Sequence, residues 1–281
     1  MNTQEQVRQF YDKVGWQVVE DGNYQNARYE DLRPVARDYV HRCHLRVNRF
    51  LNPTGKLILD AGSGPVQYPE YLTYSAGYDF RVCVDISIVA LMEARKRVAD
   101  KGLYVVADVS NLPFRNESFD GLVSLHTLHH LPQAGQKTAY REFYRLLTHG
   151  AKGVVVNGWT ESRLMQRTRW LVSLMESAGN AWGALRGRKI ERLKGKPGGK
   201  QDPTGTYIQK LDADSLGRDL EGKIPFEIWA WRSVNVRFMR AVFHDILGGR
   251  LLLRGLFWLE ECFPHYFGRV GQYPMVVISK Q

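Results

Sequence analysis

The sequence has few cysteines and no long apolar run. Its three cysteines, Cys43, Cys83 and Cys262, are odd in number and lack metal-ligand spacing, which is typical of reduced thiols. The start, MNTQEQVRQF, has no apolar signal-peptide core, and no segment approaches the ~20 apolar residues of a membrane span. The most apolar stretch, residues 251–263, is interrupted by charged residues. These absences predict a cytoplasmic protein.

Acidic residues are too few to balance the basic ones, and the formal net charge is +10. Much of the excess lies in residues 186–200, where Glu191 is the only acid. Nucleic-acid binding favours a basic patch with stacking aromatics, and Trp182 is the only aromatic residue close by. We therefore interpret this stretch as a solvated loop.

Short apolar runs alternate with helical stretches along the middle of the chain. The runs are KLILDAG, RVCVDIS, LYVVADVS, SFDGLVSLHTL and GAKGVVVNGW, and Ser87 is a candidate N-cap for the helix that follows the second run. The alternation breaks near Thr160, and the sheet resumes at residues 226–231 and 273–278. The pattern predicts a Rossmann-like, doubly wound α/β fold with a mostly parallel seven-stranded sheet.

The same pattern divides the chain into four parts. We expect a helical N-terminal cap over residues 1–52 and a ligand-binding core over residues 53–159. Residues 160–225 read as a lid insertion that shapes a substrate site, and residues 226–281 as strands and helices that complete the sheet.

A glycine turn follows the first strand, in the stretch LDAGSGP. Gly62 and Gly64 have the spacing of a dinucleotide-binding turn, but Gln67 stands where a third glycine would be. Asp60 precedes the turn, and a carboxylate there disfavours a phosphate group. The turn therefore favours a positively charged ligand without phosphates, and S-adenosyl-L-methionine, with its sulfonium and ammonium groups, has this character. The same two residues disfavour an NAD-dependent oxidoreductase.

Acidic residues also end the second and third predicted strands. Asp85 lies about twenty residues beyond the glycine turn, where a carboxylate that accepts hydrogen bonds from ribose hydroxyls is expected. Asp108, followed by Val109, is placed to receive the exocyclic amine of adenine. Both acids point to the crevice where open α/β sheets bind ligands.

Four motifs in register, LDAGSGP, VDIS, ADVSNLPF and SFDGLVSLHTLHHLP, resemble those of class I SAM-dependent methyltransferases. The similarity covers residues 55–157, and the most similar variant is the small-molecule group typified by ubiquinone/menaquinone-biosynthesis methyltransferases. It implies that the methionine end of the cofactor is held by Asp60, Gly62 and Gly64.

The resemblance implies further roles for residues after the second, third and fourth strands. Asp85 would bind the ribose, and the adenine would lie against Ile86, Asp108 and Val109. The reactive end would be bordered by Ser124, Leu125 and His126, and Tyr11 in the N-terminal helix would close over the cofactor.

Two groups of polar residues are candidates for the chemistry and the acceptor. His126, His129 and His130 lack a nearby carboxylate, so the cluster does not predict a metal site. His129 and His130 are expected to begin the helix after the fourth strand and to serve packing or capping, whereas His126, nearest the crevice, is a candidate general base. Tyr207 and Gln209, which precede a predicted helix, are candidate acceptor-binding residues.

We therefore expect methyl transfer to an O, N or C atom of a small-molecule or lipid-like acceptor. An alternative is an RNA methyltransferase that uses residues 186–200, and DNA is less favoured because the usual amino- and C5-methyltransferase motifs are missing. A second alternative is a non-catalytic SAM-binding module at a membrane surface, and peripheral membrane contact stays open. No feature predicts an obligate protein partner.

Overall fold

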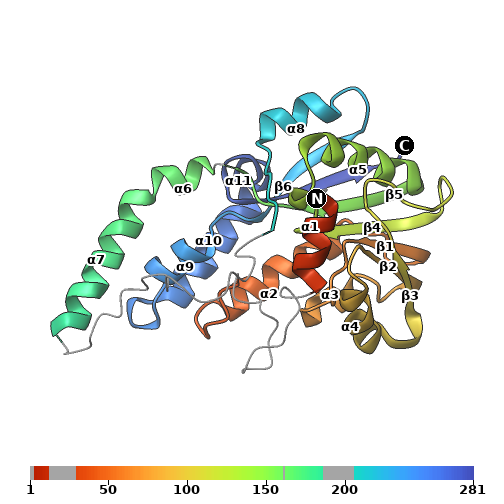
Figure 1. Cartoon of the computed structure of the whole chain (residues 1–281). Coiled ribbons are helices and arrows are strands. Elements are labelled where there is room, and N and C mark those ends of the chain that lie inside the picture. The colour runs from red at the N-terminus through yellow and green to blue at the C-terminus, as the bar shows by residue number, and fades with distance from the viewer. Residues whose placement is uncertain (1–2, 13–29, 161, 186–205) are drawn as a thin grey trace.

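The computed structural model describes residues 3–12, 30–160, 162–185 and 206–281. A seven-stranded sheet lies at the centre, with helices on both of its faces (Figure 1). The strands are β1 (Gly55–Ala61), β2 (Tyr78–Asp85), β3 (Gly102–Val106), β4 (Phe119–Leu125), β5 (Leu147–Val156), β6 (Phe226–Arg232) and β7 (Tyr273–Ser279). The predicted doubly wound α/β fold is confirmed.

The strand order is β3-β2-β1-β4-β5-β7-β6. Strands β1 to β5 are parallel, whereas β7 runs antiparallel to both of its neighbours, β5 and β6. The order reverses between β1 and β4, so the carboxyl ends of β2, β1 and β4 lie side by side at the switch point. Open α/β sheets bind their ligands at this position.

Two helical layers bury the apolar faces of the sheet. Apolar residues of β1, β2 and β4 pack on one face against α5 (Gln133–Leu146) and α8 (Ala213–Leu220). The other face packs against α3 (Pro69–Thr73) and α4 (Ile88–Val98), and α2 (Arg37–Leu45) contacts α3 and β6 on that side. The parallel strands are thus covered on both faces, as parallel sheets require.

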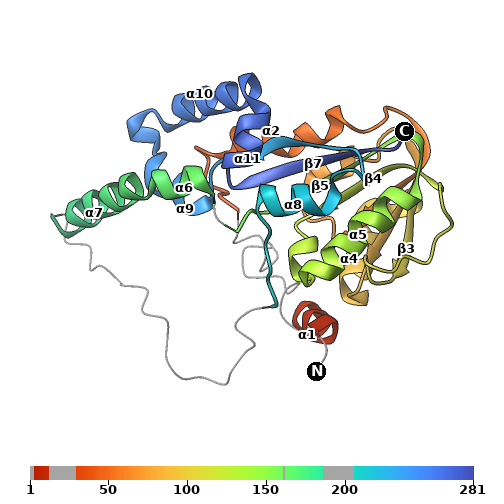
Figure 2. The ribbon, with the colours of Figure 1, turned by 90° about the horizontal axis from the view of Figure 1, so that it is seen from above.

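The remaining helices lie at the ends of the chain or form an arm beside the sheet. They are α1 (Thr3–Phe10), α6 (Arg163–Arg167), α7 (Arg169–Leu185), α9 (Val236–Val242), α10 (Gly249–Cys262) and α11 (Pro264–Val270). Short 3₁₀ turns occupy Arg46–Arg49, Ala99–Lys101, Leu128–His130 and Asp245–Leu247. Helix α7 extends away from the sheet and packs along α9 (Figures 1 and 2).

The last part of the expected lid packs on the sheet. Helix α8 lies within residues 160–225, but Leu216 and Leu220 are buried in the same core as β4 and β7. Leu216 and Leu220 are four residues apart and share one helix face, which packs on the sheet. Residues 213–220 therefore belong to the central domain. The basic residues 186–200 lie outside the described part of the chain.

Candidate functional site

The glycine turn directly follows β1 and is fixed by both neighbouring strands. Gly62 and Gly64 have positive φ angles of 74° and 53°. The amide of Gly62 donates to the Val84 carbonyl of β2 at 2.7 Å. A Cβ atom on Gly62 would lie 2.1 Å from the side chain of Thr127, which follows β4. Glycine is therefore required at position 62, both for backbone conformation and for space.

Asp85, the last residue of β2, faces this turn. Its two carboxylate oxygens accept the amides of Gly64 and Ser87, each at 2.9 Å. Burial raises the pKa of Asp85 to about 6, although these hydrogen bonds act in the opposite direction. Within the described residues no lysine or arginine forms an ion pair with this carboxylate. Hydroxyl groups of a ligand would stabilise its ionised form.

Asp60 lies elsewhere than expected. Its side chain is buried at 2% exposure, and one carboxylate oxygen accepts the Nε–H of Arg81 at 3.0 Å. Arg81, on β2, is itself 1% exposed and also donates to the Tyr71 carbonyl. The charge of Asp60 is thus neutralised inside the protein. This corrects the expectation that Asp60 balances the positive end of a ligand at the mouth of the turn.

The expected adenine-binding residues lie after β2 and β3. Both carboxylate oxygens of Asp108 accept hydrogen bonds from Ser110, from its amide at 2.9 Å and its hydroxyl at 2.7 Å. Val109 is 6% exposed and packs in the core, so only its backbone is available to a ligand. Ile86 is half-buried beside Asp85.

The N-terminal segment crosses the carboxyl end of β1. The Tyr11 hydroxyl lies 2.7 Å from Nε2 of His130, which follows β4. The Ser87 hydroxyl, at the N-cap of α4 after β2, donates to the Asp12 carboxylate at 2.5 Å. Strand β1 lies between β2 and β4, so residues 11 and 12 span its end. The sequence analysis included Tyr11 but missed Asp12, the next residue in the same motif.

The three residues expected at the reactive end have different positions. Ser124 is fully buried, and its hydroxyl donates to the Ala61 carbonyl at 2.8 Å, linking β4 to β1. The hydroxyl is thus engaged within the sheet, and a ligand contact of Ser124 stays a prediction. Leu125 is half-buried and packs against the core on the face of the sheet that α3 and α4 cover. His126 has a positive φ of 57°, and its ring packs against Trp231 and Tyr273 with centroid distances of 5.1 and 5.7 Å.

The environment of His126 disfavours the role of general base. Burial, together with the nearby charge of Arg232, lowers the pKa of His126 to about 3. An imidazole with this pKa is neutral at pH 7 but is a weak proton acceptor. The positive φ angle of His126 is an unusual backbone conformation for a residue other than glycine, and such conformations are often found at functional sites. The ring itself packs against Trp231 and Tyr273.

His129 and His130 occupy the 3₁₀ turn between β4 and α5. Nδ1 of His130 lies 2.9 Å from the Tyr207 carbonyl, so it is the protonated nitrogen, and Nε2 accepts from Tyr11. The Gln209 side-chain oxygen accepts the amide of Gln133 at 3.0 Å and the Tyr207 hydroxyl at 2.7 Å. Gln209 therefore caps the start of α5 through its side-chain oxygen, and its contact with an acceptor stays a prediction. Tyr207 connects this cap to His130.

A polar and aromatic wall, missed by the sequence analysis, continues beyond His126. A β-bulge near the end of β6 lets Trp231 and Arg232 lie against each other, and the Arg232 guanidinium is 4.6 Å from the centre of the Tyr273 ring. Arg232 also pairs with Glu30. Among the residues that the structure describes, neither the buried Trp231 indole N–H nor the buried Arg232 Nε–H has a hydrogen-bond partner. Buried donors of this kind indicate a place where a ligand or water accepts hydrogen bonds.

Lys210 lies close to this wall. A Cβ atom on Gly158, after β5, would be 3.3 Å from the Lys210 ammonium and 3.5 Å from the Tyr273 ring. Burial lowers the pKa of Lys210, and no carboxylate of the described chain forms an ion pair with it. Lys210 therefore adds an uncompensated positive charge at the carboxyl ends of β5 to β7.

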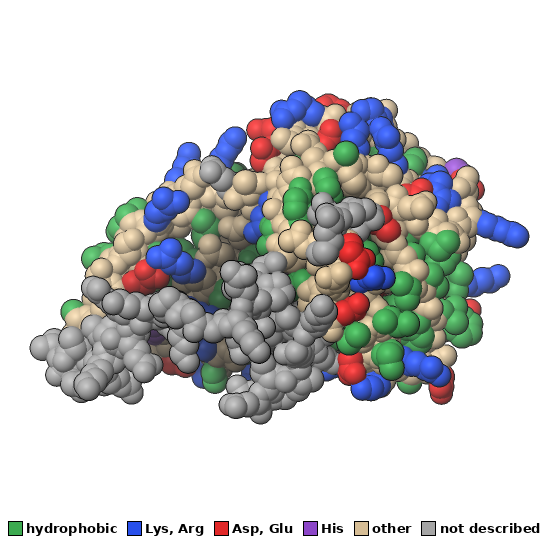
Figure 3. All heavy atoms as spheres, viewed as in Figure 1, with side chains coloured by type: hydrophobic (Ala, Val, Ile, Leu, Met, Phe, Trp, Pro, Cys, Tyr) green, Lys and Arg blue, Asp and Glu red, His purple; other side chains and the backbone are tan. Residues whose placement is uncertain are grey.

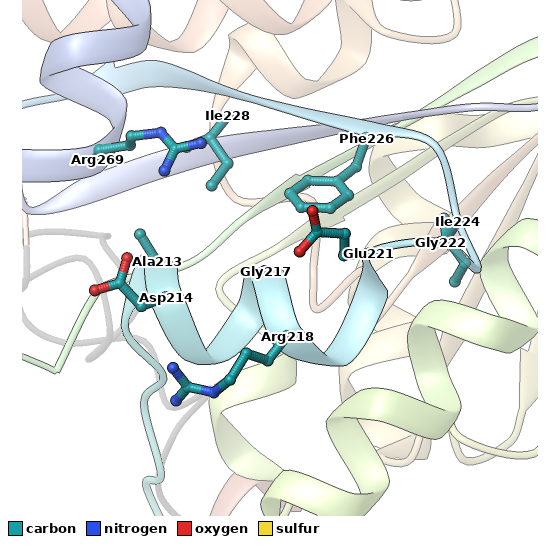
Figure 4. A pocket seen from close by; sticks show the side chains of 10 residues that line it. All are labelled: Ala213, Asp214, Gly217, Arg218, Glu221, Gly222, Ile224, Phe226, Ile228 and Arg269. Atoms are coloured by element: carbon teal, nitrogen blue, oxygen red, sulfur yellow. The ribbon is translucent and has the colours of Figure 1, made fainter.

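A separate surface pocket of about 610 Å³ lies between α8, β6 and α11 (Figure 4). Its wall includes Arg218, Glu221 and Phe226, and none of the residues expected to bind cofactor or acceptor lines it. Over the described ranges, no three His, Cys, Asp or Glu side chains are grouped as metal ligands. The surface pocket therefore does not coincide with the expected site residues. We take the carboxyl ends of the central strands as the candidate site.

The crevice fits S-adenosyl-L-methionine on three counts. The positive φ angles at Gly62 and Gly64 bring backbone amides to the surface of the turn without side chains in the way. Asp85 is a half-buried acceptor beside that turn and has no cation partner within the described residues. Residues 11 and 12 cover the same strand end. A ligand with an amino-acid tail and a ribose diol matches these features.

Comparison with known proteins agrees with this geometry. Residues 59–155 match the family model described as a methyltransferase domain. The chain is 33% identical over 144 residues to a tRNA (carboxymethyluridine(34)-5-O)-methyltransferase of Arabidopsis thaliana, covering 44% of this chain and 33% of that protein. It is 25% identical over 138 residues to a ubiquinone/menaquinone biosynthesis C-methyltransferase of Coxiella burnetii, covering 46% and 54% of the two chains.

Solved structures show the same fold over a longer stretch. The geranyl diphosphate C-methyltransferase of Streptomyces coelicolor A3(2) aligns with a TM-score of 0.56 and 13% identity, covering 100% of this chain and 98% of that one. Residues 59–155 therefore carry a domain similar to methyltransferase domains, on the Rossmann-like fold that these structures share. The chain spans 33% of the Arabidopsis thaliana tRNA methyltransferase and 26% of a probable tRNA methyltransferase of Homo sapiens that it also matches.

Proposed function

We propose that the protein transfers the methyl group of S-adenosyl-L-methionine to a small-molecule or lipid-like acceptor. The observation that carries this proposal is the pairing of two environments at the carboxyl ends of neighbouring strands. Gly62, Gly64 and Asp85 form a polar cradle at β1 and β2. His126 and Tyr273 contribute to a largely aromatic wall at β4, β6 and β7. Methyl transfer requires the donor and the acceptor to be bound side by side, so the protein needs two adjoining binding surfaces.

The residues of the cradle would bind and orient the cofactor. Amides of the turn at Gly62 and Gly64 would hold the methionine end, and Asp85 would accept hydrogen bonds from the ribose hydroxyls. Asp108, with Ile86 and the Val109 backbone, would border the adenine. Tyr11 and Asp12 would cover the crevice and keep water out. When bound, the cofactor supplies a methyl group already activated by its sulfonium, so the protein contributes mainly proximity and orientation.

The aromatic wall would position the acceptor. Its rings offer apolar contact, and the neutral His126 adds no charge to it. Lys210 lies close to the wall, and its positive charge would lower the pKa of an acceptor hydroxyl and favour the ionised, nucleophilic form. The described part of the chain therefore supports activation of the acceptor by electrostatics rather than by a histidine base.

Methylation of tRNA is the second candidate. The net charge of +10 favours a polyanionic partner, and the similarity to tRNA methyltransferases points the same way. Against it, the wall is built from side chains that are buried or half-buried, including Trp231 at 0% exposure. A small or lipid-like acceptor matches an enclosed, largely aromatic wall better than a nucleotide presented on a large RNA.

Labelled methyl transfer separates these candidates. Wild-type protein is incubated with S-adenosyl-L-methionine carrying a labelled methyl group and with three fractions of a cell extract: organic-soluble, water-soluble small-molecule and purified tRNA. The proposal predicts label in one of the first two fractions and none with Asp85→Ala. Label confined to tRNA would contradict the acceptor class, and absence of label in all fractions would contradict the activity.

A further inference from the structure

Helix α10 carries an apolar stripe on the side that faces solvent. Its most exposed members are Leu251 at 73%, Trp258 at 63% and Leu252 at 51% exposure. The outer stripe of α10, as we call it, consists of Leu251, Leu252, Gly255, Trp258, Leu259 and Cys262. The spacing of these residues places them on one helical face. No charged residue interrupts this face.

The opposite, inner face of α10 packs the helix against the rest of the protein. Leu253 is 1% exposed in the cluster between α2, α9 and α10, and Leu256 and Phe257 pack against it. Glu260 is fully buried and accepts hydrogen bonds from Tyr39 and Ser233. The helix is therefore firmly docked through its inner face, and the outer stripe is not needed to bury it. Apolar side chains on the exposed face require another explanation.

Exposed apolar residues continue beyond both ends of the helix. Ile246 and Leu247, just before it, are 91% and 53% exposed, and Phe263 and Tyr266, just after it, are 58% and 53% exposed. Figure 2 shows α10 at the outer edge of the ribbon, which agrees with the exposure of these side chains. The apolar surface thus extends along the whole helix.

The charges beside the stripe are basic or neutralised. Arg250 and Arg254, four residues apart, border it on one side, and Arg250 pairs with Asp245 at 2.8 Å. Glu261, the other nearby acid, accepts from Arg46 at 2.8 Å and also pairs with Arg49. An apolar stripe with aromatic residues and flanking arginines is the pattern of a helix that lies in a membrane interface. The net charge of +10 favours anionic lipid.

We propose that the outer stripe of α10 docks the protein on an anionic lipid surface. No helix in the ranges that the structure describes is long and apolar enough to cross a bilayer, so the contact is peripheral. A second copy of the chain fits less well, because a helix of 14 residues offers a face of only roughly 21 by 10 Å. Stable dimers bury about 800 Å² on each partner, which is several times that area.

Lipid docking does not depend on the methyltransferase activity. Docking on lipid is compatible with a soluble acceptor and with a lipid-like one. For a lipid-like acceptor, docking would also bring the enzyme to its substrate. A failure of methyl transfer therefore leaves it intact, and a failure of lipid binding leaves the transfer reaction intact.

Vesicle co-sedimentation of the full-length protein tests the proposal. The probes are vesicles of pure phosphatidylcholine and vesicles of phosphatidylcholine mixed with phosphatidylglycerol. The test variant is Leu251→Glu/Trp258→Glu. The matched control is Met92→Glu on α4, because Met92 is also 63% exposed but lies within a different surface region. Figure 3 shows hydrophobic side chains gathered on that region as well.

The proposal predicts that wild type and Met92→Glu bind the anionic vesicles equally, and that the double variant binds about tenfold more weakly. Calorimetric binding of S-adenosyl-L-methionine and the melting temperature should be unchanged in both variants, which shows that they are folded. Equal binding by the double variant, equal loss in Met92→Glu, or no binding by wild type would overturn the proposal. So would a wild-type dimer that the double variant turns into a monomer.

Discussion

The raised pKa of Asp85 should make the ligand-free protein less stable as the pH rises. The pKa is about 6 in the folded protein, against 3.8 for an ordinary aspartate, because burial disfavours the charged form. The folded state therefore holds this proton more tightly than the unfolded state, and folding is favoured at low pH. The difference of about 2.2 units corresponds to about 3 kcal/mol, of which roughly 1.4 kcal/mol is lost between pH 5 and pH 8.

Urea unfolding of wild type and Asp85→Asn at a series of pH values isolates this contribution. Asparagine does not titrate, so the free energy of unfolding of the variant, relative to wild type, should rise by about 1.4 kcal/mol from pH 5 to pH 8. Asp79→Asn, at an exposed position on the same strand, serves as the control for removal of a surface carboxylate. A constant difference between wild type and Asp85→Asn across this range would refute the reasoning about burial.

Three further substitutions test separate parts of the site. Arg81→Met leaves the buried Asp60 carboxylate unpaired and should lower the free energy of unfolding by about 3–5 kcal/mol in urea, with recovery in Asp60→Asn/Arg81→Met. Gly62→Ala drives a Cβ into Thr127 and should abolish calorimetric cofactor binding, whereas Gly222→Ala, also at positive φ but with open space, should cost only about 1 kcal/mol of stability. Ser124→Ala should lower stability by about 1 kcal/mol with cofactor affinity unchanged, and a loss of affinity would support the predicted ligand contact of Ser124.

The sheet and the cradle were predictable because their signals are local. Each parallel strand appears in the sequence as a short apolar run, and the turn with Gly62 and Gly64 follows the first of them directly. Ser87 caps α4 as expected, accepting the amide of Ala90 at 3.2 Å. Strand ends, turns and caps depend on neighbouring residues, so a single sequence reveals them.

The corrected residues depend on contacts that are distant in sequence. Asp60 pairs with Arg81 only because β1 and β2 align side by side, with Ile58 opposite Arg81. His130 meets Tyr11 across 119 positions of the sequence. The neighbouring residues in the sequence do not indicate either partner. For this reason the sequence predicted a ligand contact for Asp60 and a packing role for His130. The wall at Trp231 similarly requires the bulge in β6.

Calorimetric titration with S-adenosyl-L-methionine tests the central claim most directly. The account predicts binding to wild type at pH 8 and a loss of about 100-fold or more in Asp85→Ala, because two hydrogen bonds to a charged acceptor disappear. Met92→Glu should bind like wild type. Equal affinity in wild type and Asp85→Ala, or no binding to wild type, would contradict the assignment of this crevice to the methyl donor.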